Sequence, residues 1–336
     1  MEADPTAGRS SLKGHSMKLR RRDFLALSAG ALAAQACGAT GGATPSTGSG
    51  STGTPDELDV VSGLIQSGGP PPDGIPPIEK PRYVSIREAS EIWRDDDVVD
   101  ALILDGQARA YPRMITVWHE IVNETAGGKP VSITYCPLTG SALVFSGVLP
   151  DGTTTTFGTS GQLYNSNLVM YDRATNSFWP QLFGTAVRGT HKGQRLEELP
   201  GAVTTTFGRW KAKHPDGLVL STDTGHARSY GTSPYGSYDT QEGTIFPVRF
   251  EDDRYPQKKV VVGVRWNGAA LAIPKEEHRR RREASAEVGG RSVVVLYDEE
   301  LDAVRVLYRA TTEPLVAYDV MWFAWVAFYP DTEVLT

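Results

Sequence analysis

The stretch VVDALILDGQARAYP (residues 98–112) decides the fold, because it recurs as VVVGVRWNGAALAIP at residues 260–274, a shift of 162 positions. Each copy has a branched apolar run, a two-residue turn sequence and a second short run that ends in proline. Asp105-Gly106 and Asn267-Gly268 are typical of tight β-hairpin turns, in which both residues adopt positive backbone angles. The sequence therefore predicts the same hairpin twice.

The repetition continues beyond the hairpins. At the same shift, Gly127, Gly128 and Tyr135 coincide with Gly289, Gly290 and Tyr297. Residues 275–287 consist almost wholly of Lys, Glu, Arg, Ala and His. We therefore predict a helix there and over residues 113–125 of the first copy, each ended by its glycine pair. Two strands, over residues 131–135 and 142–145, are predicted to follow in the first copy.

Four chemically versatile residues occur in the first copy only. His119, Glu120, Asn123 and Cys136 coincide with Arg281, Arg282, Ser285 and Asp298 of the second copy. A later match, from Trp210 to Trp325, has a shift of 115, so the second copy also lacks about 47 residues, the difference between the two shifts. The missing part corresponds largely to residues 153–193. Residues that the fold needs are kept twice, so residues kept once are candidates for function.

The N-terminal residues are not expected to belong to the fold. Arg20-Arg21-Arg22-Asp23-Phe24-Leu25 and the apolar run after it predict a twin-arginine signal peptide over residues 1–36. The apolar run is shorter than the roughly 20 residues of a membrane span. Cys37 suits either ordinary signal cleavage before it or the acylated cysteine of a lipoprotein. We favour lipidation, because a Gly-, Ser- and Thr-rich tether over residues 37–56 follows.

The expected product is a β-rich α+β protein in the cell envelope, on the extracytoplasmic face of the membrane. Two degenerate repeats, about residues 98–148 and 260–310, are expected to form one compact globular unit. We divide it into an N-terminal half with the candidate site, residues 57–225, and a C-terminal half, residues 226–336.

Charge and anchoring restrict the partners. Without residues 1–36 the chain keeps 28 basic and 37 acidic residues, a net charge of about −9, which argues against nucleic acid as a partner. A lipid anchor would make the membrane a partner. A small-molecule or protein partner is not identified by the sequence.

The solitary thiol of Cys136 is the first candidate for chemistry. With Cys37 lipidated it has no cysteine to pair with, and such a thiol in an oxidising compartment is buried, metal-bound or in use. His119 is a candidate base for a Cys136 nucleophile, with Asn123 orienting the imidazole. The alternative is a buried cysteine that packs as a small apolar residue and a histidine satisfied by a backbone carbonyl.

The same residues are candidate metal ligands. The thiolate and imidazole of Cys136 and His119 suit copper or zinc. Two ligands are too few, and Glu120 is the nearest candidate for a third. No spacing in the sequence matches a known metal motif.

Three further residues are candidate substrate contacts: Tyr111, Asp172 and Arg173. The guanidinium of Arg173 would suit an anionic ligand. The alternative for Asp172 and Arg173 is a turn stabilised by an internal salt bridge.

Several long motifs resemble those of one known family. They include WHEIVN (residues 118–123), TYCPLTG (134–140), YNSNLVMYDR (164–173), WPQ (179–181) and PYG (234–236). From about residue 76 to residue 336 the chain resembles the bacterial and archaeal family called domain of unknown function 3179. Many members have serine where this chain has Pro180, and some have a second cysteine at the position of Thr139. A metal that needed both thiols would therefore be lost here, and the resemblance implies no activity.

Two classes of function follow. The first is a thiol-dependent or metal-dependent enzyme of the cell envelope that works at Cys136 and His119. The second is a non-catalytic binding or scaffold lipoprotein.

Overall fold

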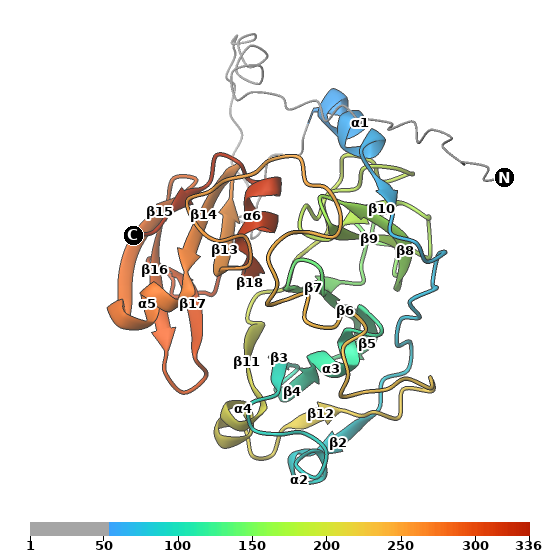
Figure 1. Ribbon diagram of the computed structural model, residues 1–336, viewed down its shortest axis with the longest axis vertical. Helices are drawn as coiled ribbons and strands as arrows, with labels where there is room; N and C mark the ends of the chain where they lie inside the picture. Colours follow the sequence, from blue (N-terminus) through green and yellow to red (C-terminus); the bar gives the residue numbers. More distant parts are fainter. Residues whose placement is uncertain (1–53) are drawn as a thin grey trace, which may run out of the picture. The chain divides into compact units, whose positions relative to one another are not determined.

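The computed structural model describes residues 54–336 (Figure 1), so the predicted signal peptide, Cys37 and most of the predicted tether lie outside the described residues. Strands make up 39% and helices 13%, which confirms the β-rich part of the prediction. Within the described part of the chain, no helix is long and apolar enough to cross a membrane. Helix α1 (Pro55–Gly63) starts inside the expected tether, because Thr54 and Glu57 form a capping box at its first turn.

Both predicted hairpins form. Strand β3 (Val98–Leu104) pairs with β4 (Gln107–Pro112), and β13 (Val260–Trp266) pairs with β14 (Ala269–Pro274). At the turns, φ is 48° at Asp105 and 46° at Asn267, and the glycine that follows each has φ of 75° and 80°. These positive angles are the ones that the turn residues predicted.

The two sheets built on these hairpins have corresponding strand orders, β11-β3-β4-β12-β2 and β18-β13-β14-β19. In each sheet the strand beside the hairpin's second strand, β12 or β19, is parallel to it. The additional strands are β2 (Tyr83–Ser85), β11 (Val203–Thr206), β12 (Leu218–Leu220), β18 (Ala317–Met321) and β19 (Glu333–Val334). Helix α4 (Phe207–Lys213) follows β11 as α6 (Trp322–Phe328) follows β18, and a short α2 (Ile86–Ala89) follows β2.

The prediction of a long helix after each hairpin is wrong. Helix α3 spans only Arg113–Thr116 and α5 only Lys275–Arg281, and each is followed by a strand, β5 (Ile121–Ala126) or β15 (Glu283–Val288). The chain turns out of the helical conformation at Glu120 and Arg282, whose φ values are 59° and 72°. Pairing of β5 and β15 with a neighbouring strand along their whole length outweighs the helix-forming composition.

The strands after α3 and α5 form two three-stranded meanders. The first is β5, β6 (Lys129–Cys136) and β7 (Ser141–Ser146), and the second is β15, β16 (Arg291–Asp298) and β17 (Ala303–Tyr308). The glycine pairs are therefore hairpin turns rather than helix ends, with φ of 56° at Gly127 and 75° at Gly128. The predicted strands over residues 131–135 and 142–145 lie within β6 and β7.

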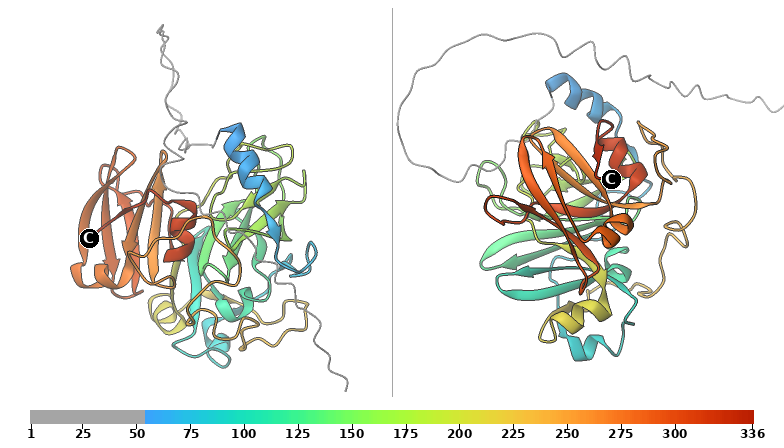
Figure 2. Two further views of the ribbon diagram at one scale, coloured as in Figure 1. Left: turned by 45° about the horizontal axis from the view of Figure 1, so that its top comes forward. Right: turned by 90° about the vertical axis from the view of Figure 1, so that its left-hand side faces the viewer.

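Two parts of the structure belong neither to the hairpin sheets nor to the meanders. One is the sheet of β1 (Gln66–Ser67), β8 (Phe157–Tyr164), β9 (Asn167–Asp172) and β10 (Phe178–Pro180). The other is the segment between β12 and β13, residues 221–259, which contains no helix or strand and which we call the strap. Figures 1 and 2 show the strap in yellow to orange, running along the outside of the molecule past β5, β6 and β7.

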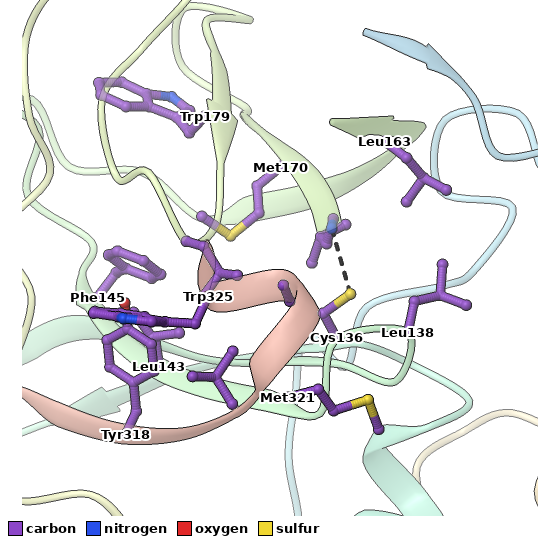
Figure 3. Packing of buried hydrophobic residues seen from close by; sticks show 14 of the residues in the cluster. Cys136, Leu138, Leu143, Phe145, Leu163, Met170, Trp179, Tyr318, Met321 and Trp325 are labelled. Atoms are coloured by element: carbon purple, nitrogen blue, oxygen red, sulfur yellow. Dashed lines mark hydrogen bonds between the residues drawn. The ribbon is translucent and has the colours of Figure 1, made fainter. Parts of the chain in front are cut away.

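Helix α6 closes the largest apolar core. Its residues Trp322, Phe323 and Trp325 are buried in one cluster with Trp179 and Cys136. Figure 3 shows Cys136 pointing into this packing, among side chains from β7, β9 and α6. Cys136 therefore faces apolar protein and not solvent.

Candidate functional site

Cys136 is the last residue of β6, and its side chain is 1% exposed. The Sγ atom accepts a hydrogen bond from the backbone N–H of Leu168 at 3.4 Å (Figure 3) and donates to the carbonyl of Ser166 at 3.8 Å. Both partners belong to the sheet that occurs once. Burial raises the pKa of the thiol to about 11, and the nearby Glu120 carboxylate raises it further. Cys136 is an un-ionised thiol at neutral pH.

His119 is fully buried, and other groups hold both of its ring nitrogens. Nδ1 lies 2.6 Å from the carbonyl oxygen of Pro76, and Nε2 lies 2.6 Å from the hydroxyl of Tyr230. Burial lowers the pKa of His119 to about 4, so the ring is neutral at neutral pH. Within residues 54–336 no hydrogen bond joins His119 to Cys136. The structure therefore does not form the predicted pair of base and nucleophile.

Asn123 holds two sheets together and does not orient His119. Its Nδ2 donates to the carbonyl of Phe157 at 2.8 Å, and its Oδ1 accepts from Ser132 Oγ at 2.6 Å and from the Phe157 N–H at 3.1 Å. These bonds join β5 to β6 and β8. The role predicted for Asn123 depended on a helix that would place it beside His119. The segment that contains Asn123 is instead the strand β5.

Glu120 is the predicted residue whose backbone lies beside the strand end that carries Cys136, since its carbonyl accepts from the Tyr135 N–H at 2.7 Å. Within residues 54–336 no hydrogen bond joins its carboxyl to the Cys136 thiol. Glu120 lies between α3 and β5, is 6% exposed, and forms a hydrogen bond with Tyr235 of the strap. Its charge acts on the Cys136 thiol, and burial raises the pKa of its own carboxyl to about 8. Among the described residues no arginine or lysine forms an ion pair with it. The site therefore contains a thiol and a carboxyl that are both largely protonated.

The described chain does not assemble a metal centre from the predicted ligands. No three His, Cys, Asp or Glu side chains of residues 54–336 are grouped so that they could hold a metal ion. His119 turns its nitrogens to Pro76 and Tyr230, away from the thiol. The donor set expected for copper or zinc is not brought together.

The predicted substrate contacts lie in three separate networks. Tyr111 is buried and donates to Glu124. Asp172 stabilises a turn by accepting from the backbone N–H of Thr175 and of Ser177 and from the indole of Trp179, at 2.6 to 3.1 Å. Arg173 forms ion pairs with Asp73 at 2.8 Å and Glu79 at 2.9 Å. The predicted internal salt bridge does not form, because the two side chains have different partners.

Sequence reasoning missed the tyrosines of the strap. Tyr230 bonds to His119, and Tyr235 bonds to Glu120. Tyr238 is 7% exposed and donates from its hydroxyl to the carbonyl of Leu138 at 3.0 Å. The available signal was the length of a segment without strand or helix pattern, since long structureless segments in folded domains are often functional.

A family model for proteins described as "Protein of unknown function (DUF3179)" matches residues 72–313. The chain belongs to this family. The resemblance predicted from the motifs is thereby confirmed. No curated protein and no solved structure matches the chain.

The DUF3179 region contains every predicted site residue from Tyr111 to Arg173, together with the whole strap and both hairpins. It ends before α6, the helix that closes the core over Cys136. The family description supplies no reaction, so function has to be argued from the geometry around Cys136 and Glu120.

Proposed function

We propose that this DUF3179 protein is exported by the twin-arginine route, anchored through Cys37, and carries out a thiol-dependent reaction at Cys136 with Glu120 as acid and base. The export signal and tether in residues 1–56 support the location. The pairing of thiol and carboxyl supports the chemistry. His119 does not take part as a base and instead binds the strap.

The repeat is part of the proposal. We infer that the two halves are degenerate copies of one α+β module, because β3–β7 and β13–β17 have the same bounds after a shift of 162 residues. The first copy acquired or retained the site, and the second acts as a scaffold for it.

The observation that carries the chemical proposal is the contrast between Glu120 and Arg282. Both residues have a left-handed backbone, and both carbonyls accept from the tyrosine of the next strand, Tyr135 at 2.7 Å and Tyr297 at 2.8 Å. Arg282 is exposed, whereas Glu120 is buried. The fold thus needs this backbone turn but not a buried acid. Burying a carboxyl without a cation is costly, so a functional benefit is expected to offset the cost.

Burial also makes Glu120 a stronger base toward Cys136. Its pKa is raised to about 8, whereas the raised pKa of the Cys136 thiol, about 11, includes the effect of the Glu120 charge itself. The Glu120 carboxylate is therefore a stronger base than the carboxylate of an exposed glutamate. In the proposed reaction Cys136 Sγ attacks an electrophilic carbon, and Glu120 takes the thiol proton and returns it to the leaving group.

A reaction with an activated acyl ester tests this proposal. The mature chain with Cys37→Ser would be incubated with p-nitrophenyl acetate and its intact mass followed. We expect one acyl group on Cys136, none in Cys136→Ser, and acylation slowed about tenfold or more in Glu120→Gln, a loss typical of a missing acid–base group. Glu79→Gln, an acid that pairs with Arg173, is the control. Equal rates in Glu120→Gln and the control would rule out the role of Glu120.

A non-catalytic binding or scaffold lipoprotein is the second candidate. One observation favours it: a hollow lined by Asp100, Thr204 and Tyr318, and a second lined by Leu143, Pro200 and Tyr318, include neither Cys136 nor Glu120 in their lining. In that case Cys136 packs as a small apolar residue and is not acylated in the folded protein.

A further inference from the structure

The strap is unusually long for a connection without regular structure. Its 39 residues join β12 to β13, whereas most connections in compact domains have about 4 to 6 residues and longer ones are often active-site lids.

The strap binds the same elements that carry the residues kept once. Its Thr232 carbonyl accepts from the indole N–H of Trp118 at 3.0 Å, and its Phe246 carbonyl accepts from Ser166 Oγ at 2.8 Å. Tyr230 and Tyr235 bind the neighbouring residues His119 and Glu120. The strap thus crosses the end of α3 and the turn between β8 and β9, on the two sides of the thiol.

The strap also supplies part of the cover over the site. Tyr235 and Tyr238 are both close enough to Cys136 for its charge to act on the pKa of their hydroxyls, and burial together with that charge raises both values. Lys258, at the far end of the strap, donates to the Tyr238 carbonyl at 2.7 Å and lies 3.1 Å from the centre of the Tyr238 ring. Displacing these tyrosines would remove the part of the cover over Glu120 and Cys136 that the strap supplies.

Little apolar burial holds the strap down. All of its residues are described, and Tyr238 alone is buried, while Phe246, Val248 and Tyr255 of its second part pack partly buried against the core. Attachment of the first part, residues 221–245, depends largely on hydrogen bonds, each of modest net strength. Gly231 and Gly236, with φ of 101° and 59°, directly follow Tyr230 and Tyr235. Segments with few buried contacts open at low free energy without unfolding of the rest of the protein.

We propose that the strap is a lid over Cys136 and Glu120, held shut by the hydrogen bonds of Tyr230 to His119 and of Tyr235 to Glu120. This inference rests on the proposed function, for which it provides the entry step. A substrate enters while the strap is displaced, and closure restores the water-free surroundings that keep Glu120 basic. His119, on this account, is a positioning residue for the lid.

Cys136 provides the readout, because it is the only cysteine in residues 54–336. The Cys37→Ser mature chain would be labelled with iodoacetamide under native conditions, and the rate followed by intact mass. Tyr230→Phe removes the hydroxyl that bonds to His119, and Tyr235→Phe removes the one that bonds to Glu120. Both variants keep the aromatic ring. We expect labelling about fivefold faster in each, the effect of about 1 kcal/mol. Tyr83→Phe, which removes a hydroxyl bonded to Glu124, is the matched control.

Hydrogen exchange of the unmodified protein keeps the test independent of these variants. We expect amides of the strap to exchange faster than amides of β6, and Cys136 to be labelled faster than the protein unfolds. Labelling of Cys136 only at the rate of global unfolding, or equal labelling in Tyr230→Phe, Tyr235→Phe and Tyr83→Phe, would overturn the lid. If the strap opens but acylation does not depend on Glu120, the lid stands and the proposed reaction fails.

Discussion

The Nε2 atom of His119 accepts a hydrogen bond from the hydroxyl of Tyr230, 2.6 Å away. The direction of this bond follows from the other side of the ring, where Nδ1 faces the carbonyl oxygen of Pro76 and must be the nitrogen that carries hydrogen. If Nε2 were protonated as well, its N–H would point at the hydroxyl of Tyr230, and the hydroxyl could no longer donate to the ring. The strap is therefore bound to the body through the neutral form of His119.

Acidification is expected to loosen the protein through His119. Its pKa falls from 6.5 to about 4 on folding, mainly by burial, with His226 and Arg228 contributing. A lowered histidine pKa gives stability that is fully present above pH 6.5 and is lost as the pH falls toward 4. Urea unfolding of the wild type should therefore weaken over this window, and His119→Gln should show a smaller decline. Parallel pH curves for the two proteins would contradict this prediction.

Glu120 should have the opposite effect on the alkaline side. Its pKa is raised from 4.5 to about 8, so the folded protein binds one more proton than the unfolded chain between these values. Stability from this group is fully present below pH 4.5 and is lost as the pH rises through 8, by at most about 5 kcal/mol. Glu120→Gln should be relatively more stable at pH 8.5 than at pH 5, as measured by urea unfolding. Glu79→Gln, which changes an exposed ion pair, should not gain stability relative to the wild type between pH 5 and pH 8.5.

Asn123 should matter for stability and not for the reactivity of Cys136. Asn123→Ala leaves the Phe157 N–H and carbonyl and the Ser132 hydroxyl without their partner, so we expect a loss of about 2–4 kcal/mol. Ser285→Ala changes the equivalent, exposed position of the second half and should cost less than about 0.5 kcal/mol. Urea unfolding would measure both. If Asn123→Ala slows acylation of Cys136 without destabilising the fold, the structural role is wrong.

The hairpins could be predicted from the sequence because their determinants are local. Asp105-Gly106 and Asn267-Gly268 specify the turn by their own backbone preferences, and a branched apolar run precedes each turn. The prediction of a helix after each hairpin is wrong because the determinant there is not local. Residues 283–288 have helix-forming composition, but their conformation is decided by pairing with β16, which no local pattern reports.

Comparison of the repeats could locate the site, but it could not show which side chains contact one another there. The residues that occur in the first copy only include Glu120 and Cys136, whose charges act on each other, and also His119 and Asn123, which belong to other networks. The spacing of residues in sequence does not report which way a side chain points at the end of a strand. The partners of His119 and Glu120, Tyr230 and Tyr235, are more than 100 residues away along the chain. Only the tertiary structure brings them together.

A glycine in the second half provides a last test of how the core is closed. A Cβ at Gly263 in β13 would overlap the ring of Trp325 in α6, and both residues are buried. Gly263→Ala should therefore destabilise by about 1–3 kcal/mol, as overpacking of a core does. Gly63→Ala, at the end of α1, meets nothing within 4 Å and should be neutral or slightly stabilising. Because α6 also packs around Cys136, Gly263→Ala should raise iodoacetamide labelling of the thiol along with the loss of stability. Unchanged labelling in a destabilised variant would mean that access to Cys136 depends on the strap alone and not on α6.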